Sequence, residues 1–103
     1  MRRPRIGLQQ MLEDILGHRR VYFNPPENLK MEYPCLRYEL SKINNLQADN
    51  VHFDGYGRYE LTYLTSNPDD PMVDTLLDSM PYCRYDRHNV YQGLHHHVYT
   101  VYY

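Results

Sequence analysis

Three consecutive histidines near the C-terminus are the side chains in this sequence best suited to chemistry. In an extended strand His95 and His97 share one face, and two imidazoles on one face could bind a metal ion if a third ligand approached. The candidates for that third ligand are Asp86, His88 and Cys83. No second pair of histidines or cysteines has the spacing of a metal site. We therefore expect an exposed or interfacial run of histidines, including His96, and no metal ligands.

Other combinations that could support catalysis are incomplete. Cys83 and His88 could act as a nucleophile and its base, but nothing in the sequence marks an oxyanion hole. Gly55 and Gly57 are not followed by the helix start and the Lys-Ser or Lys-Thr pair of a phosphate-binding loop. We therefore expect no catalytic residues and no cofactor, and we expect that the protein is not an enzyme.

The charged residues form two groups of opposite sign. Arg19 and Arg20 follow the first predicted helix, whereas Asp74 and Asp78 face outward on the second. Between identical copies such groups could meet head to tail, so these four residues are candidate interface residues. Two solvated helix faces are the alternative, because exposed ion pairs stabilise little. The net charge of −2 argues against a protein that neutralises many nucleic-acid phosphates.

The composition bounds the fold that must position these residues. A chain of 103 residues with 42% hydrophobic and 23% charged side chains is typical of one globular domain, expected over residues 1–103. No apolar run approaches the roughly 20 residues that cross a bilayer, and no apolar leader is visible, so we expect a cytoplasmic protein without a membrane partner. Cys35 and Cys83 are expected to be buried thiols.

Two segments place apolar residues at helical spacing. The first predicts a helix that Gly17 ends as a left-handed cap, and its apolar residues are Leu8, Met11, Leu12, Ile15 and Leu16. The second begins after Asp70 and Pro71, an N-cap and a first-turn proline. It ends at Pro81, and its apolar residues are Met72, Val73, Leu76, Leu77 and Met80.

Five segments have the pattern or composition of strands. They cover residues 21–23, 35–43, about 58–65, 82–86 and 94–103, and the last two are joined through His88, Asn89 and Gly93. The second and third strands form an antiparallel pair with a long loop from Asn44 to Gly57. The order of elements predicts an α+β fold, a mainly antiparallel sheet of four to five strands with two helices packed on one face.

Tyrosine is unusually abundant, with 12 residues against 2 Phe and no Trp. Tyrosine suits both half-buried strands and surfaces that meet other proteins, so strand propensity alone is one explanation. Interface use is the other. The candidates are Tyr56, Tyr91 and Tyr99, because they lie in or beside the long loop, the last turn and the C-terminal strand.

Several short sequence words occur in a recognisable order. They are YFNPPEN at 22–28, YPCLRY at 33–38, ADN at 48–50, YELT at 59–62, NPD at 67–69 and PYC at 81–83, with DR at 86–87 and LH at 94–95 before an aromatic C-terminus. Together they span nearly the whole chain. In this order and spacing the chain resembles the small tail terminator (tail completion) proteins of long-tailed bacteriophages.

The resemblance implies a structural virion protein that forms a ring, usually sixfold, on the head-proximal end of the tail tube. The ring would end tube growth and join the tail to the head. The implied partners are further copies of the chain, the tail tube protein, and the head connector or stopper protein, with genomic DNA passing without specific binding. The implied location is the virion neck, after assembly in the host cytoplasm. In the long loop, Asp49 and Asn50 are the implied contacts.

Three other functions are compatible with the sequence. Another neck protein, such as a head-completion or stopper protein, would bind DNA-filled heads instead of isolated tails. A small metal-dependent enzyme would use the histidines, and metal analysis would identify it. A module that binds peptides along a sheet edge is allowed by the strand-rich pattern.

Overall fold

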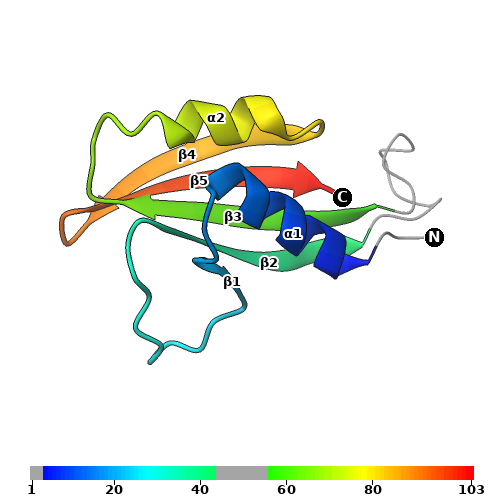
Figure 1. Cartoon of the computed structure of the whole chain (residues 1–103), viewed down its shortest axis with the longest axis horizontal. Helices are drawn as coiled ribbons and strands as arrows, with labels where there is room; N and C mark the ends of the chain where they lie inside the picture. The colour runs from blue at the N-terminus through cyan, green and yellow to red at the C-terminus, as the bar shows by residue number, and fades with distance from the viewer. Residues whose placement is uncertain (1–3, 44–55) are drawn as a thin grey trace.

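The computed structural model describes residues 4–43 and 56–103 (Figure 1). Its elements follow in the order helix, three strands, helix, two strands, which confirms the predicted α+β class. They are α1 (Arg5–Leu16), β1 (Val21–Phe23), β2 (Cys35–Ile43), β3 (Gly57–Thr65), α2 (Met72–Ser79), β4 (Cys83–Tyr91) and β5 (Leu94–Tyr102). None of the described helices is long and apolar enough to cross a membrane.

The five described strands form one sheet in the order β1-β2-β3-β5-β4. The predicted antiparallel pairing of β2 with β3 is confirmed, β5 is antiparallel to both β3 and β4, and β1 runs parallel to β2. The two edges are therefore unlike, because β1 has three residues and β4 has nine. Asp49 and Asn50, the loop residues implied as contacts, lie outside the described residues.

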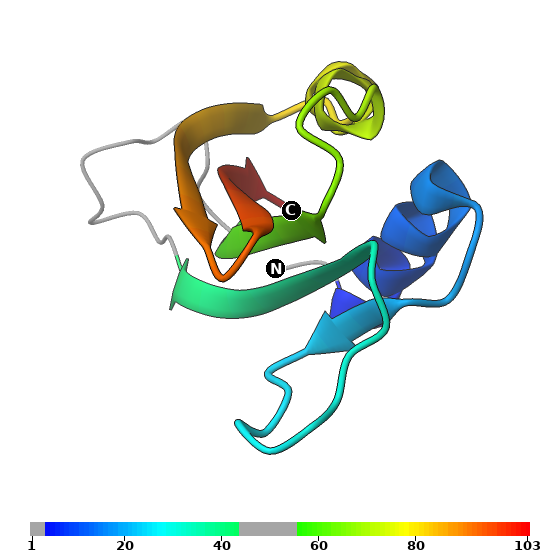
Figure 2. The same ribbon diagram turned by 90° about the vertical axis from the view of Figure 1, so that its left-hand side faces the viewer.

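The core lies between the sheet and the two helices, which Figure 2 shows on the same side of the sheet. Leu36 pairs with Tyr63 and Tyr38 pairs with Leu61 across β2 and β3, and all four side chains are buried. Each fully buried leucine contributes about 1.5–3 kcal/mol. The completely buried leucines that the helices contribute are Leu8, Leu12 and Leu76.

The ends of the helices agree with the predicted signals. Gly17 has φ 77° in the left-handed region, and its N–H donates to the Glu13 carbonyl at 2.9 Å. Pro71 has helical angles, and the Met72 N–H donates to Asp70 Oδ1 at 2.9 Å. A backbone N–H that has no partner within the first turn of α2 is thereby satisfied, as expected for an N-cap.

Strand β4 is longer than the sequence predicted. Its ladder continues through Tyr91, and His88 and Asn89 pair with β5 instead of forming a turn. The turn consists of Gln92 and Gly93, whose φ values of 52° and 77° are typical of a two-residue hairpin. The prediction failed because every residue of β4 after Cys83 is exposed, so the strand lacks the apolar alternation that marks a half-buried strand.

Candidate functional site

Strand β4 presents an exposed surface at the long edge of the sheet. No described strand pairs with its outer side. Seven large apolar side chains are exposed among the described residues, and four of them lie on or beside β4: Tyr82, Tyr85, Val90 and Tyr91. Val90 and Tyr91 are 58% and 66% exposed. A concentration of exposed apolar groups on one edge is typical of a surface that binds another protein.

Charged side chains and a β-bulge in the middle of β4 hinder pairing of this edge with another strand. Arg84 Nε lies 2.8 Å from Asp86 Oδ1, and Arg87 reaches Glu60 of β3 at 3.4 Å. The register with β5 shifts between Tyr85 and Arg87, which marks a β-bulge. Charged side chains and bulges discourage indiscriminate pairing of edge strands. The apolar groups at the two ends of β4 are therefore better placed than its centre for a specific contact.

The three tyrosines expected at an interface have different surroundings. Tyr91 is exposed near the hairpin turn. Tyr56 is half-buried, and its ring meets that of Tyr82 edge-on at 5.7 Å. The expectation for Tyr99 is wrong, because its side chain is completely buried and its hydroxyl donates to the Val73 carbonyl at 2.8 Å. Tyr99 faces the helices from an inner strand, so it belongs to the core.

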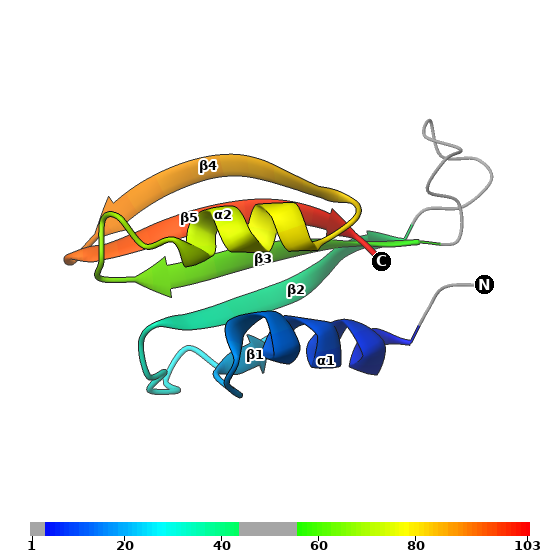
Figure 3. The same ribbon diagram turned by 45° about the horizontal axis from the view of Figure 1, so that its top comes forward.

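The charged candidates lie in the helical layer. Asp74 and Asp78 are exposed on α2, and neither forms an ion pair within the described ranges 4–43 and 56–103. Arg19 is exposed after α1, whereas Arg20 is half-buried and its Nε donates to the Pro34 carbonyl at 3.0 Å. Figure 3 shows α1 and α2 along the same side of the sheet. The two charge groups therefore share one layer of the molecule.

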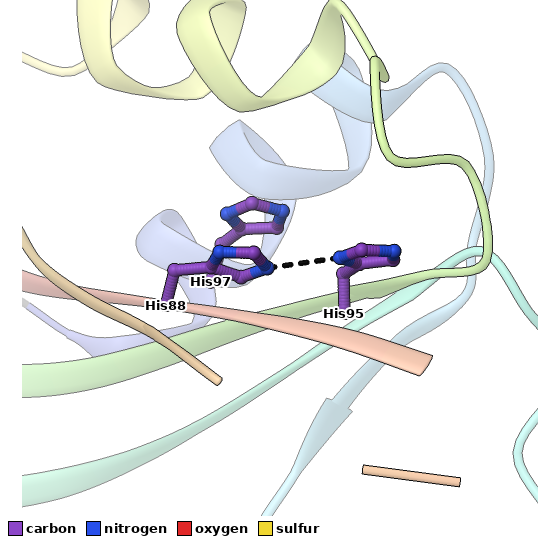
Figure 4. Close-up of side chains that lie close together, drawn as sticks. All are labelled: His88, His95 and His97. Atoms are coloured by element: carbon purple, nitrogen blue, oxygen red, sulfur yellow. Dashed lines mark hydrogen bonds between the residues drawn. The ribbon is translucent and has the colours of Figure 1, made fainter. Parts of the chain in front are cut away.

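Three histidines, His88, His95 and His97, form what we call the histidine cluster on the β4–β5 hairpin (Figure 4). The rings of His88 and His97 stack with centroids 4.4 Å apart, and His88 Nε2 lies 2.9 Å from His95 Nδ1. One nitrogen of each ring lies within 4.8 Å of the others. The structure thus brings His88, one of the three residues considered as a third ligand, beside His95 and His97.

His97 is the buried member of the cluster, only 7% exposed. Its Nδ1 is hydrogen-bonded to the Tyr85 hydroxyl at 2.8 Å, and its buried Nε2 has no hydrogen-bond partner among the described residues. Burial is the main cause that lowers the pKa of His97, and the neighbouring His88 and His95 lower it further. The neutral imidazole is therefore favoured. The expectation of an exposed or interfacial run is therefore wrong for His97, whose side chain is buried within the chain itself.

His96 is separated from the cluster by the alternation of the strand. It borders a groove of about 180 Å³ on the sheet face opposite the helices, with Arg87 and Glu60 also in its wall. The groove combines residues of β2, β3, β4 and β5. Sequence reasoning missed it, because no spacing along the chain indicates which strands will be neighbours.

The two cysteines do not contribute to a reactive site. Both thiols are free, and burial raises the pKa of each to about 11. Cys83 and His88 are five positions apart on β4, a separation of roughly 16 Å along an extended strand. They are too far apart to act as a nucleophile and its base.

Comparisons with known protein families, curated proteins and solved structures found no match. The resemblance to tail terminators therefore stays a prediction from the quoted residues.

Proposed function

We propose that this chain is a tail terminator of a long-tailed bacteriophage. In this proposal about six copies form a ring on the head-proximal end of the tail tube, where they end tube growth and join the tail to the head connector. The observation that carries the proposal is the exposed edge strand β4 with its apolar side chains. The resemblance of the sequence words and their order to that family supports it independently.

The two unlike edges of the sheet favour a contact that repeats head to tail. A surface that pairs with itself gives a closed dimer, whereas a contact between two different surfaces continues from copy to copy. Strand β4 is long and exposed, and β1 at the opposite edge is short and parallel to its neighbour. A contact from β4 to a different surface of the next copy closes into a ring when its rotation divides a full turn.

The hairpin end of β4 offers most of the energy for such a contact. Val90 and Tyr91 keep more than half of their surface exposed, and burying that apolar surface in an interface would gain roughly 25 cal/mol for each Å². Tyrosine is also enriched among the few residues that dominate binding energies. We therefore place Tyr91, which borders the groove on the sheet face opposite the helices, at the centre of the subunit contact. Val90 pairs with His95 and points to the other face, so it would contribute only where the partner wraps around the strand edge.

Substitution of these two side chains tests the proposal. In the variant V90K/Y91K two exposed groups become charged, so the subunit should fold with an unchanged melting temperature but not assemble. In a complementation assay, electron microscopy should then show overlong tails that do not join heads. The control is I6K, which places one positive charge on an exposed apolar residue of α1.

The control variant should complete tails of normal length. Tail completion by V90K/Y91K at the wild-type level would contradict the proposal, as would an equal loss in I6K. Binding of the wild-type protein to DNA-filled heads in the absence of tails would favour a stopper protein instead.

A further inference from the structure

We propose that the histidine cluster, His88, His95 and His97, binds one divalent late transition-metal ion such as Zn²⁺. This proposal rests on the geometry of the β4–β5 hairpin and is independent of the proposed assembly function.

The ring nitrogens of the three histidines lie close enough to reach one metal ion after small rotations of the side chains. Zinc binds imidazole nitrogen at about 2.0–2.1 Å, so two nitrogens on one tetrahedral ion lie roughly 3.3 Å apart. The nitrogens of His88 and His95 are already 2.9 Å apart, and a nitrogen of His97 lies within 4.8 Å of both. His88 is exposed and His95 is half-buried, so both rings can turn toward an ion while the paired strands hold their backbones.

His97 supplies a fixed ligand with an unused nitrogen. Its Nδ1 is bonded to the Tyr85 hydroxyl, which leaves Nε2 as the nitrogen available to a ligand. That Nε2 is buried without a hydrogen-bond partner in the described part of the chain, and a buried polar atom without a partner is costly. A bound metal would supply the missing partner, with Nδ1–H donating to Tyr85. Metal-binding histidines commonly have such a second partner, which fixes the ring orientation.

The donor set selects the class of ion. Three neutral imidazole nitrogens suit zinc, copper, nickel and cobalt, whereas calcium and magnesium prefer oxygen ligands. The cluster contains no carboxylate or thiolate, so hard cations have no ligand of their preferred kind in it. Three protein ligands leave the fourth position of a tetrahedral ion open to water.

Calorimetric titration of the chelator-treated full chain with ZnCl₂ tests this site. We expect one Zn²⁺ per chain in the wild type, and binding about tenfold or more weaker in both H88A and H95A, since loss of even an outer partner of a ligand costs 10–100-fold. The matched control is H96A, which removes a neighbouring histidine on the opposite face and should bind like the wild type. H97A is not used, because it would also leave a cavity in the protein.

Two further measurements separate the site from weak surface binding. Zn²⁺ should raise the melting temperature of the wild type and of H96A but not of H88A, because a ligand of the native state stabilises it. In Y85F, Zn²⁺ affinity should fall about tenfold, because Nδ1 loses its partner. Wild-type binding that does not saturate at one ion per chain would overturn the proposal, as would an equal loss of affinity in H96A and H88A.

Discussion

Asp70 joins the end of β3 to the start of α2 through three hydrogen bonds. Its carboxylate accepts from the Tyr63 hydroxyl at 2.8 Å, the Thr65 hydroxyl at 2.9 Å and the Met72 N–H at 2.9 Å. Burial alone would raise the pKa of Asp70, but these three donors outweigh it and hold the pKa below its usual value. The N-cap was predictable from the sequence, whereas the bonds to Tyr63 and Thr65 depend on the tertiary fold.

We predict that D70A lowers the free energy of unfolding by about 1–3 kcal/mol at pH 7. The variant loses the cap of α2 and leaves the hydroxyl groups of two buried residues, Tyr63 and Thr65, without their acceptor. Chemical denaturation monitored by circular dichroism measures the change. The control D69A alters an exposed neighbouring carboxylate and should change stability by less than about 0.5 kcal/mol.

The effect of D70A also depends on pH. Because the pKa of Asp70 is lower in the folded chain, the charged carboxylate stabilises the fold above its unfolded pKa of about 3.9. That stabilisation is lost as the pH falls through the lower folded value. The stability difference between wild type and D70A should therefore shrink below about pH 4, and a difference that stays constant down to pH 2 would contradict this explanation.

Among the elements, the β4–β5 hairpin depends most on its turn. Gln92 and Gly93 both have positive φ, and nothing lies within 4 Å of a Cβ placed on Gly93, so backbone conformation alone decides the effect of a substitution. G93A should lower stability by roughly 1–2 kcal/mol, the cost of the left-handed region for a residue with a Cβ. Q92N should raise it by about 0.5 kcal/mol, because Asn-Gly is the preferred pair for this turn.

Thermal unfolding of G93A and Q92N checks these opposite changes in stability. If G93A leaves the melting temperature unchanged, the turn does not have the described conformation in solution.

The elements differ in how far the sequence could predict them. Both helices and strand β2 followed from apolar periodicity, because each buries one face against the rest of the fold. Strands β3 and β5 followed from strand-forming residues next to turn signals. The full length of β4 did not, since its exposed residues show no such pattern. Its register with β5 was therefore unknown, and that register is what places His88 opposite His97.

The interface candidates show the same limit of prediction from the sequence. Tyr91 was predictable as an exposed residue beside a turn, but no local pattern separates it from the buried Tyr99. The distinction depends on the order of strands in the sheet, in which β5 lies inside and β4 lies at the edge.

At the scale of the whole molecule, the helical layer carries charged side chains that form no ion pairs among the described residues. Asp74 and Asp78 project from α2, and Arg19 follows α1, all three exposed and outside the ion pairs of the described residues. Within one copy these charges contribute little to stability. In the proposed ring, attraction of opposite charges between copies would speed their encounter and set its orientation.

We predict that D74K/D78K slows ring assembly on purified tails about tenfold or more at low salt, since electrostatic steering changes association rates by 10–10³. The effect should vanish near 1 M salt, where the screening length is only about 3 Å. Light scattering at several salt concentrations measures the rate, with D14K, an exposed acid on α1, as the control. Adding R19E to D74K/D78K should restore part of the rate, because the charges then oppose each other again with reversed signs. A salt dependence equal to that of the wild type would show that these charges do not guide the copies together.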